Sequence, residues 1–124
     1  MVRLLVGSGY EVTVLDDLST GHRQALEGAE LFKADIRDSG ALDKLFAAHQ
    51  FDAVMHFCAK SLVGESVQQP LEYYDNNVAG TLSLLQAMQR HGVEKLVFSS
   101  TAAVFGEPEV EFIDESHPTR PVNP

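Results

Sequence analysis

The sequence predicts an α/β fold in which helices pack on the faces of a parallel sheet. Short apolar segments rich in β-branched residues alternate along the chain with longer segments of helical periodicity. Polar residues follow directly after several of these apolar segments, as in the run LVFSST at residues 96–101. Ligands bind at the carboxyl ends of parallel strands, so this order indicates a binding site along one sheet edge.

Two strands are expected in the first third of the chain. Residues 1–8 have the composition of a helix end, which the glycines at positions 7 and 9 stop. Residues 10–15 alternate and carry β-branched side chains, which predicts a strand. A loop at 16–21 and a short helix at 22–27 then lead to a second strand at 30–33.

A capped helix and a third strand are expected next. Asp38 and Ser39 can cap a helix over residues 40–49. One face of that helix is apolar and carries Leu42, Leu45 and Phe46. The continuous apolar run at 53–57 predicts a buried strand.

A long helix is expected in the second half. Pro70 opens it, it runs to Arg90, and Gly92 closes it. Its apolar residues recur at helical spacing: Val78, Leu82, Leu85 and Met88. A fourth strand is expected at 95–98. Residues 106–124 are rich in Pro, Glu, Asp and Thr, which predicts an extended segment over the sheet rim.

Composition excludes several classes of function. The net charge is −9, from 18 acidic and 9 basic residues, which disfavours binding to nucleic acid or to an anionic membrane surface. No apolar run approaches the roughly 20 residues that span a bilayer. Cys58 is the only cysteine and cannot form an internal disulfide, so a reduced, cytoplasmic setting is expected.

Two acids close the first expected strand. In a dinucleotide-binding fold, an acid at the end of the second strand accepts hydrogen bonds from the adenosine ribose, about 20 residues after a glycine-rich loop. Asp16 and Asp17 fit that place, although counting back from Asp16 runs beyond Met1. The alternative is an ordinary capped turn, because Asp, Ser, Thr and Gly are turn residues.

The next two strand ends carry further candidates. Asp35 and Ile36 follow the second strand and can meet the edge of an adenine ring, or Asp35 can simply lead into a helix. Small residues after the third strand would let a dinucleotide pass close by; this segment comprises Phe57, Cys58 and Ala59. Lys60 can offset a pyrophosphate or remain solvated in a loop.

Polar residues in the second half complete the candidate site. Asparagine is a poor helix former, so Asn76 and Asn77 inside a helix suggest a local hydrogen-bonding role, more clearly for Asn77. Ser99, Ser100 and Thr101 follow the fourth strand. A hydroxyl is a weak base near pH 7, so these side chains would orient or relay a proton for a partner, or else form a Ser-rich turn.

Four segments together resemble the UDP-glucose 4-epimerases, a family of extended short-chain dehydrogenases/reductases. They are 16–21 (DDLSTG), 56–66 (HFCAKSLVGES), 73–78 (YYDNNV) and 99–106 (SSTAAVFG). The resemblance continues to the final PTRPVNP at 118–124. It implies a Rossmann-like doubly wound parallel sheet that holds NAD, with UDP-glucose and UDP-galactose as substrates. The sugar 4-hydroxyl would be oxidised by hydride transfer, and the hydride would return to the other face of the 4-keto sugar.

The resemblance also implies residue roles. Thr101 would hydrogen-bond the reacting sugar oxygen as the catalytic hydroxyl, and Lys60 and Thr101 would meet the substrate. The implied cofactor-binding residues are Asp16, Asp17, Leu18, Asp35, Ile36, Phe57, Cys58, Ala59, Lys60, Asn77 and Ser99. No metal ligand is expected, because the five histidines lack metal-site spacing. The full-length protein would be a homodimer.

The chain departs from that family pattern at both ends. The family's Gly-x-x-Gly-x-x-Gly loop would precede Met1, and its Tyr-x-x-x-Lys pair would follow Pro124. Residues 1–124 are therefore expected to form a partial NAD-binding domain without its first strand or the nucleotide-sugar domain. We expect this piece alone to be inactive, and to be unstable or to close its sheet differently.

Other functions remain open on the sequence. Sugar dehydratases of the same family place an acid just after the hydroxyl run, where this chain has Ala102 and Ala103, so epimerisation is favoured. An epimerase for another nucleotide sugar, a decarboxylase, or a non-catalytic NAD-binding module also fits. A phospho-receiver domain would need an aspartate where this chain has Phe57 and Cys58.

Overall fold

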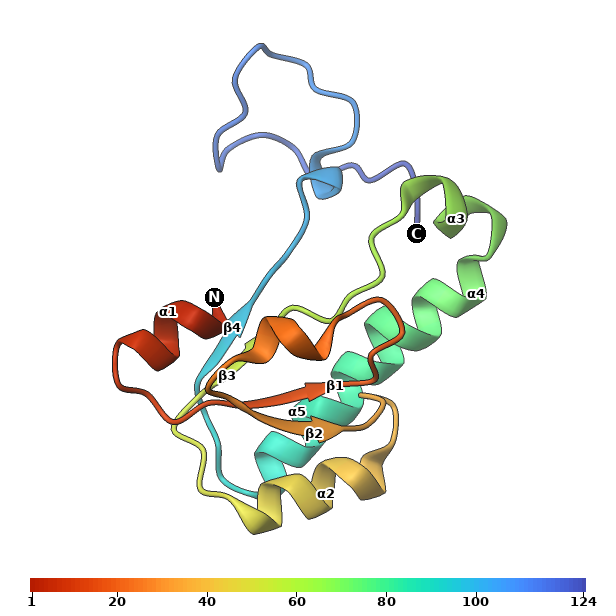
Figure 1. The fold of residues 1–124 in the computed structure, drawn as a ribbon. Coiled ribbons are helices and arrows are strands. Elements are labelled where there is room, and N and C mark those ends of the chain that lie inside the picture. Colours follow the sequence, from red (N-terminus) through yellow and green to blue (C-terminus); the bar gives the residue numbers. More distant parts are fainter.

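The computed structural model describes residues 1–124 and shows an α/β arrangement (Figure 1). The helices and strands are α1 Val2–Gly7, β1 Thr13–Asp16, η1 Arg23–Leu26, β2 Glu30–Lys33, α2 Ser39–Ala48, β3 Val54–His56, α3 Val63–Gln68, α4 Pro70–Tyr73, η2 Tyr74–Ala79, α5 Gly80–Arg90, β4 Leu96–Phe98 and η3 Ala102–Phe105. Segments η1 and η3 are 3₁₀ helices, and η2 is a π-helix. No helix has the length and apolar character that crossing a membrane requires.

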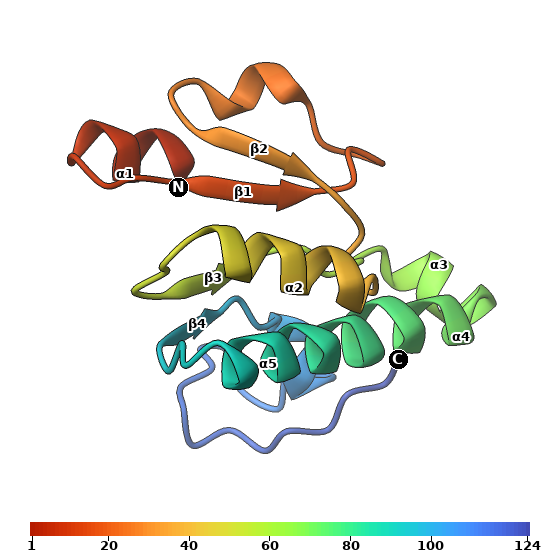
Figure 2. The same cartoon turned by 90° about the horizontal axis from the view of Figure 1, so that it is seen from below.

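The four strands form two separate parallel pairs (Figure 2). Strand β1 pairs with β2, so that Thr13 faces Glu30 and Asp16 faces Lys33. Strand β3 pairs with β4, with His56 opposite Phe98. The predicted parallel pairing is confirmed. Because both pairs are parallel, the carboxyl ends within each pair lie side by side.

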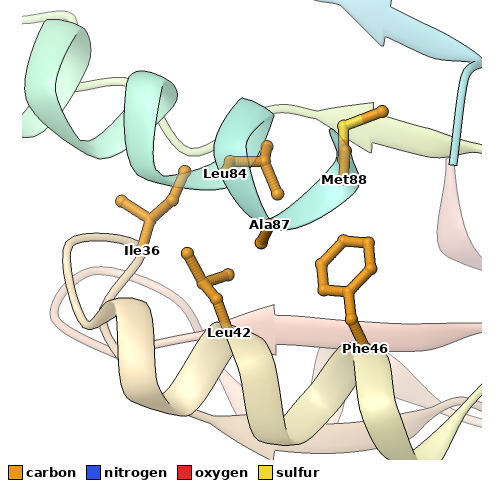
Figure 3. Packing of buried hydrophobic residues seen from close by; sticks show 6 residues of the cluster. All are labelled: Ile36, Leu42, Phe46, Leu84, Ala87 and Met88. Carbon is orange, nitrogen blue, oxygen red and sulfur yellow. The ribbon is translucent and has the colours of Figure 1, made fainter. Parts of the chain in front are cut away.

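The core lies between α2 and α5 (Figure 3). Leu42 and Phe46 point from α2 toward Leu84, Ala87 and Met88 of α5. Ile36, in the turn before α2, completes the cluster. Leu42 and Ala87 are fully buried, so this helix pair forms the hydrophobic core of the chain.

The sequence located α2 and its cap well. The carboxylate of Asp38 accepts a hydrogen bond from the backbone N–H of Ala41 at 2.9 Å, as an N-cap does. Leu42, Leu45 and Phe46 are buried as expected. Strand β2 has the predicted bounds, while β1 is shorter than its prediction and begins at Thr13.

The expected long helix from Pro70 to Arg90 is interrupted. It consists of α4, the π-helical η2 and then α5, and it is preceded by a separate helix α3 that the sequence did not predict. Of the predicted apolar series, only Met88 is buried, whereas Val78, Leu82 and Leu85 are exposed. The π-helix shifts the face that α5 presents to α2, because its wider turns change the angular position of every later residue.

The last segment, 106–124, contains no regular helix or strand, as predicted. It leaves the body after η3 and returns to α3 (Figure 1). There the Asn123 side chain donates a hydrogen bond to Ser66 Oγ at 3.2 Å. Gly106 has φ 69°, and a Cβ at this position would clash with the carbonyl of Arg120, so this turn requires glycine.

Candidate functional site

The carboxyl ends of β1, β2 and β3 open onto one cavity of about 680 Å³. Eight residues that the sequence nominated line it: Asp16, Asp17, Asp35, Ile36, Phe57, Cys58, Ala59 and Lys60. Four other nominated residues are not in its lining: Leu18, Asn77, Ser99 and Thr101. A second cavity of about 380 Å³, lined by Phe46, Phe51 and His91 among others, holds none of the nominated residues.

The loop after β1 is built around two carboxylates. Asp16 Oδ1 accepts a hydrogen bond from the Leu18 N–H at 2.7 Å, and Asp17 Oδ1 accepts one from the Ser19 N–H at 2.8 Å. Leu18 has φ 60°, a left-handed conformation that costs a side-chain-bearing residue about 1–3 kcal/mol. The two Asp side chains hold this strained turn in place.

Asp16 keeps one carboxylate oxygen free of protein hydrogen bonds. A Cβ at Gly21 would lie 3.0 Å from Asp16 Oδ2, so the glycine keeps the approach to that oxygen open. An exposed acceptor at the end of β1, beside a position without a side chain, fits the ribose hydroxyls of a dinucleotide. The free acceptor at this strand end is therefore compatible with NAD.

The turn after β2 contains an ion-paired arginine that the sequence did not single out. Arg37 Nη2 lies 2.6 Å from Asp35 Oδ2, and Arg37 Nη1 lies 2.6 Å from Asp75 Oδ2. The hydrogen bonds from Arg37 lower the pKa of Asp35, and both carboxylates raise the pKa of Arg37. Asp35 is thus held ionised at the cavity wall.

Two asparagines of η2 hold the loop after β3. Asn77 Oδ1 accepts a hydrogen bond from the Lys60 N–H at 2.8 Å, and Asn77 Nδ2 donates to the Lys60 carbonyl at 2.9 Å. Asn76 Nδ2 donates to the Cys58 carbonyl at 3.2 Å, and Asn76 also lines the cavity. The predicted hydrogen-bonding role within this helix is confirmed, and its partner is the adjoining loop.

The ammonium group of Lys60 turns toward helix α4. Its Nζ lies 3.6 Å from Glu72 Oε2 and 5.9 Å from the centre of the Tyr73 ring. Its side chain is 40% exposed, so this ion pair is weak and leaves the group free to move toward an anionic ligand.

Tyr73 is a second cavity residue that the sequence did not single out. Its hydroxyl lies within hydrogen-bond distance of the Leu62 N–H, the Leu62 carbonyl and Glu65 Oε2, at 3.1, 2.9 and 2.7 Å. Burial and the bond to Glu65 raise the pKa of Tyr73. Tyr73 belongs to the segment 73–78 that resembles the epimerases, but no role for its side chain was assigned from the sequence.

His56, at the end of β3, is buried and neutral. Thr81 Oγ1 donates to the Asn77 carbonyl at 2.6 Å, so it accepts a hydrogen bond from His56 Nε2–H at 3.2 Å. His56 Nδ1 has no partner, and burial lowers the pKa of this histidine. The imidazole ring stacks on the Phe98 ring, with 4.9 Å between the ring centres.

Cys58 lies at the cavity beside these strand ends. The residue is exposed as a whole, but its thiol is partly buried and lies 3.5 Å from His56 Nε2. Burial, and secondarily Asp16, Asp17 and Asp35, raise the pKa of the thiol. A protonated thiol is a poor nucleophile, so Cys58 serves as lining.

The hydroxyl run after β4 lies outside the cavity. Thr101 caps η3, where its Oγ1 accepts a hydrogen bond from the Ala103 N–H at 3.1 Å. The Ser99 N–H donates to the His56 carbonyl at 3.1 Å, which places Ser99 at the end of the β3–β4 pair. Both residues thus lie at the carboxyl end of the second strand pair.

A family profile, a protein relative and solved structures all match this chain over almost its whole length. The sequence profile of the family described as GDP-mannose 4,6 dehydratase matches residues 1–124. A UDP-glucose 4-epimerase from Halalkalibacterium halodurans is 54% identical over 123 residues, which are 99% of this chain and 37% of that protein. The chain thus spans about 37% of the length of that relative.

Two solved structures share this fold closely. The UDP-glucose 4-epimerase from Brucella ovis in complex with NAD has a TM-score of 0.94 at 40% identity, covering 98% of this chain and 38% of that one. The enzyme from Bifidobacterium longum in complex with NAD⁺ and UDP has a TM-score of 0.90 at 38% identity, covering 94% and 37%. This chain therefore belongs to the GDP-mannose 4,6 dehydratase family and is similar over almost its whole length to UDP-glucose 4-epimerases.

Proposed function

We propose that the full-length protein interconverts UDP-glucose and UDP-galactose with a bound NAD, and that residues 1–124 form part of its NAD-binding domain. The observation that carries this proposal is the cavity where Asp16, Asp35 and Lys60 meet at three strand ends. The similarity to UDP-glucose 4-epimerases solved with NAD supports it. A reduced, cytoplasmic setting fits the single free Cys58.

Each strand end would hold one part of the cofactor. Asp16 would accept hydrogen bonds from the adenosine ribose through its free Oδ2, with Asp17 and Leu18 beside it. Asp35 and Ile36 would flank the adenine. The segment from Phe57 to Lys60 would lie along the middle of the cofactor, where the side chains of Phe57, Cys58 and Ala59 carry no charge.

The second strand pair would face the reacting end. Ser99 and Asn77 would support the nicotinamide, Asn77 through the Lys60 loop that it holds. Thr101 would hydrogen-bond the sugar 4-oxygen, and Lys60 would contribute positive charge toward the substrate. When bound, NAD supplies the hydride acceptor and donor for carbon 4 of the sugar. Thr101 would orient the 4-hydroxyl rather than remove its proton, because a threonine hydroxyl is a weak base.

A dehydratase is the second candidate, because the matching family profile carries that description. Elimination needs an acid next to the reacting hydroxyl to protonate the leaving group. The two residues after Thr101 are Ala102 and Ala103, which cannot supply a proton. The epimerase is therefore the better-supported candidate.

The test is an epimerase assay on the full-length protein with UDP-galactose, coupled to an NAD-dependent detection of UDP-glucose. Thr101→Val should lower kcat about 10²-fold, because it removes one hydrogen bond to the reacting oxygen. Thr101→Ser should retain most of the activity. Formation of a 4-keto-6-deoxy product, or equal activity in the Val and Ser variants, would contradict this assignment.

We also propose that the full-length protein is a homodimer. An apolar stripe of exposed side chains runs along α4, η2 and α5: Leu71, Tyr74, Val78, Leu82 and Leu85. Such an uncharged stripe can pack against its own copy in a symmetric pair. Leu82→Glu should shift sedimentation toward the monomer, whereas Leu4→Glu on α1, which is equally open to solvent, should not. A Leu82→Glu protein that stays dimeric would place the interface elsewhere.

A further inference from the structure

The π-helical segment η2 is attached to two different cavity loops. On one side, Asp75 is ion-paired with Arg37 in the turn after β2. On the other side, Asn76 and Asn77 hold the backbone of the loop after β3. Three consecutive side chains of η2 therefore reach two loops that belong to different strand pairs.

The first residue of α5, directly after η2, lies close to the turn after β2. A Cβ on Gly80 would lie 2.7 Å from Ile36 Cγ2 and 3.4 Å from Arg37 Cγ, so glycine is needed for this approach. Arg37 is anchored from the other side as well, because Asp35 accepts hydrogen bonds from its Nε at 3.0 Å and its Nη2 at 2.6 Å. The guanidinium group thus bridges two carboxylates that lie 40 residues apart in sequence.

We propose that Arg37 and Asp75 are a positioning pair, which sets the place of the Lys60 loop by holding η2 against the turn that carries Asp35 and Ile36. The pair acts through η2, so neither side chain needs to touch the nucleotide. This proposal rests on the proposed function only in taking NAD as the ligand of the cavity.

A simpler role for Arg37 predicts the opposite change in NAD affinity in one variant. If Arg37 acted only by attracting an anionic ligand, Asp75→Asn would leave its charge less neutralised and binding would tighten. As a positioning pair, the same variant releases η2, and binding weakens although the site has gained positive charge. Asp75→Asn therefore separates the two roles.

The chain contains a matched control pair at the other end of α5. Arg90 lies 2.9 Å from Asp43 Oδ1 and joins α5 to α2. The side chains of Arg90 and Asp43 are 44% and 44% exposed, and those of Arg37 and Asp75 are 39% and 58% exposed. Both pairs are therefore surface ion pairs of similar exposure. Arg90 and Asp43 do not line the cavity.

The first readout is amide hydrogen exchange in the full-length protein without added ligand. Asp75→Asn and Arg37→Gln should speed exchange of the Lys60 N–H, which Asn77 protects, by about tenfold. Asp43→Asn and Arg90→Gln should leave it unchanged. Equal exchange at Lys60 in both sets of variants would overturn the proposal, whatever the ligand of the cavity is.

The second readout is the Kd for NAD, measured by titration calorimetry on the full-length protein. Asp75→Asn and Arg37→Gln should each weaken binding roughly tenfold, and the double variant should be little worse than either, because both break one bridge. Arg37→Lys should not rescue binding, since an ammonium group lacks the fork that spans two carboxylates. Tighter binding in Asp75→Asn, or full rescue by Arg37→Lys, would overturn the proposal. If the wild-type protein did not bind NAD, the proposed function would fail and the exchange readout would still decide this inference.

Discussion

The side-chain amide of Asn77 pairs with the backbone of Lys60 as a neighbouring β-strand would. It accepts a hydrogen bond from the Lys60 N–H at 2.8 Å and donates one to the Lys60 carbonyl at 2.9 Å. The planar side-chain amide of Asn carries an acceptor oxygen and a donor nitrogen, so one group can make both bonds. The loop after β3 is thereby given a fixed backbone without being part of a sheet.

Asn77→Asp should destabilise the protein by about 1–3 kcal/mol, because the Lys60 carbonyl loses its donor and faces a carboxylate instead. Urea unfolding followed by circular dichroism measures the change. Ser83→Ala is the control: it removes one exposed bond to the Ala79 carbonyl on the same helical run, and the expected change is within about 0.5 kcal/mol. Equal effects of the two substitutions would refute the pairing.

Gly80→Ala should destabilise by about 1–3 kcal/mol, because the new methyl group would meet Ile36 Cγ2 at 2.7 Å. Gly64→Ala in α3 has open space around its Cβ and should stabilise by about 0.5–1 kcal/mol. Thermal unfolding of the two variants should move the midpoint in opposite directions. The double variant Gly80→Ala with Ile36→Leu should recover part of the loss, because leucine lacks the Cγ2 methyl group that the new Cβ would meet.

Tyr73→Phe should cost about 1–3 kcal/mol, because the Leu62 N–H would lose its acceptor and Glu65 its partner. The neighbouring Tyr74 is 54% exposed, so Tyr74→Phe should stay within about 0.5 kcal/mol of the wild type. Denaturant titration of both variants makes this comparison. A loss in Tyr74→Phe as large as in Tyr73→Phe would argue against a specific role of the Tyr73 hydroxyl.

His56 should make stability fall as the pH is lowered. Burial lowers its pKa in the folded protein below the ordinary value of 6.5, so the unfolded chain takes up the proton first. The contribution of neutral His56 to the free energy of unfolding is complete above pH 6.5. It is lost as the pH falls from 6.5 toward the pKa of His56 in the folded protein. The slope from this one group is at most about 1.4 kcal/mol per pH unit. Urea midpoints between pH 7.5 and pH 5 should show it, and His56→Gln should flatten the curve; an unchanged slope in His56→Gln would assign it to other groups.

Local patterns in the sequence predicted the carboxyl ends of the strands to within one residue. Asp16, Asp35 and Lys60 each stand at or just after the end of a short apolar run, and all three line the same cavity. Parallel pairing brings the ends of β1 and β2 to one edge, and the packing of the two strand pairs adds the end of β3. The cap at Asp38 was also predictable, because it depends on residues within three positions of each other. Each of these features arises within a few residues.

Features that depend on distant partners were not predictable in the same way. The pairing of Arg37 with Asp75 joins positions far apart in sequence, and neither residue type is unusual where it stands. The interruption of the long helix by η2 changed which apolar residues are buried, so periodicity from Val78 onward placed the buried face wrongly. The poor helix propensity of Asn76 and Asn77 was the one local sign of that interruption.

The division of the strands into two pairs has a consequence for handling the protein. Each pair leaves strand edges without a neighbour, and unpaired backbone N–H and C=O groups on such an edge can recruit strands from other molecules. A preparation of residues 1–124 alone should therefore aggregate more readily as its concentration rises. A lysine introduced at an outward-facing position on the open edge of β1 should improve the solubility of this piece.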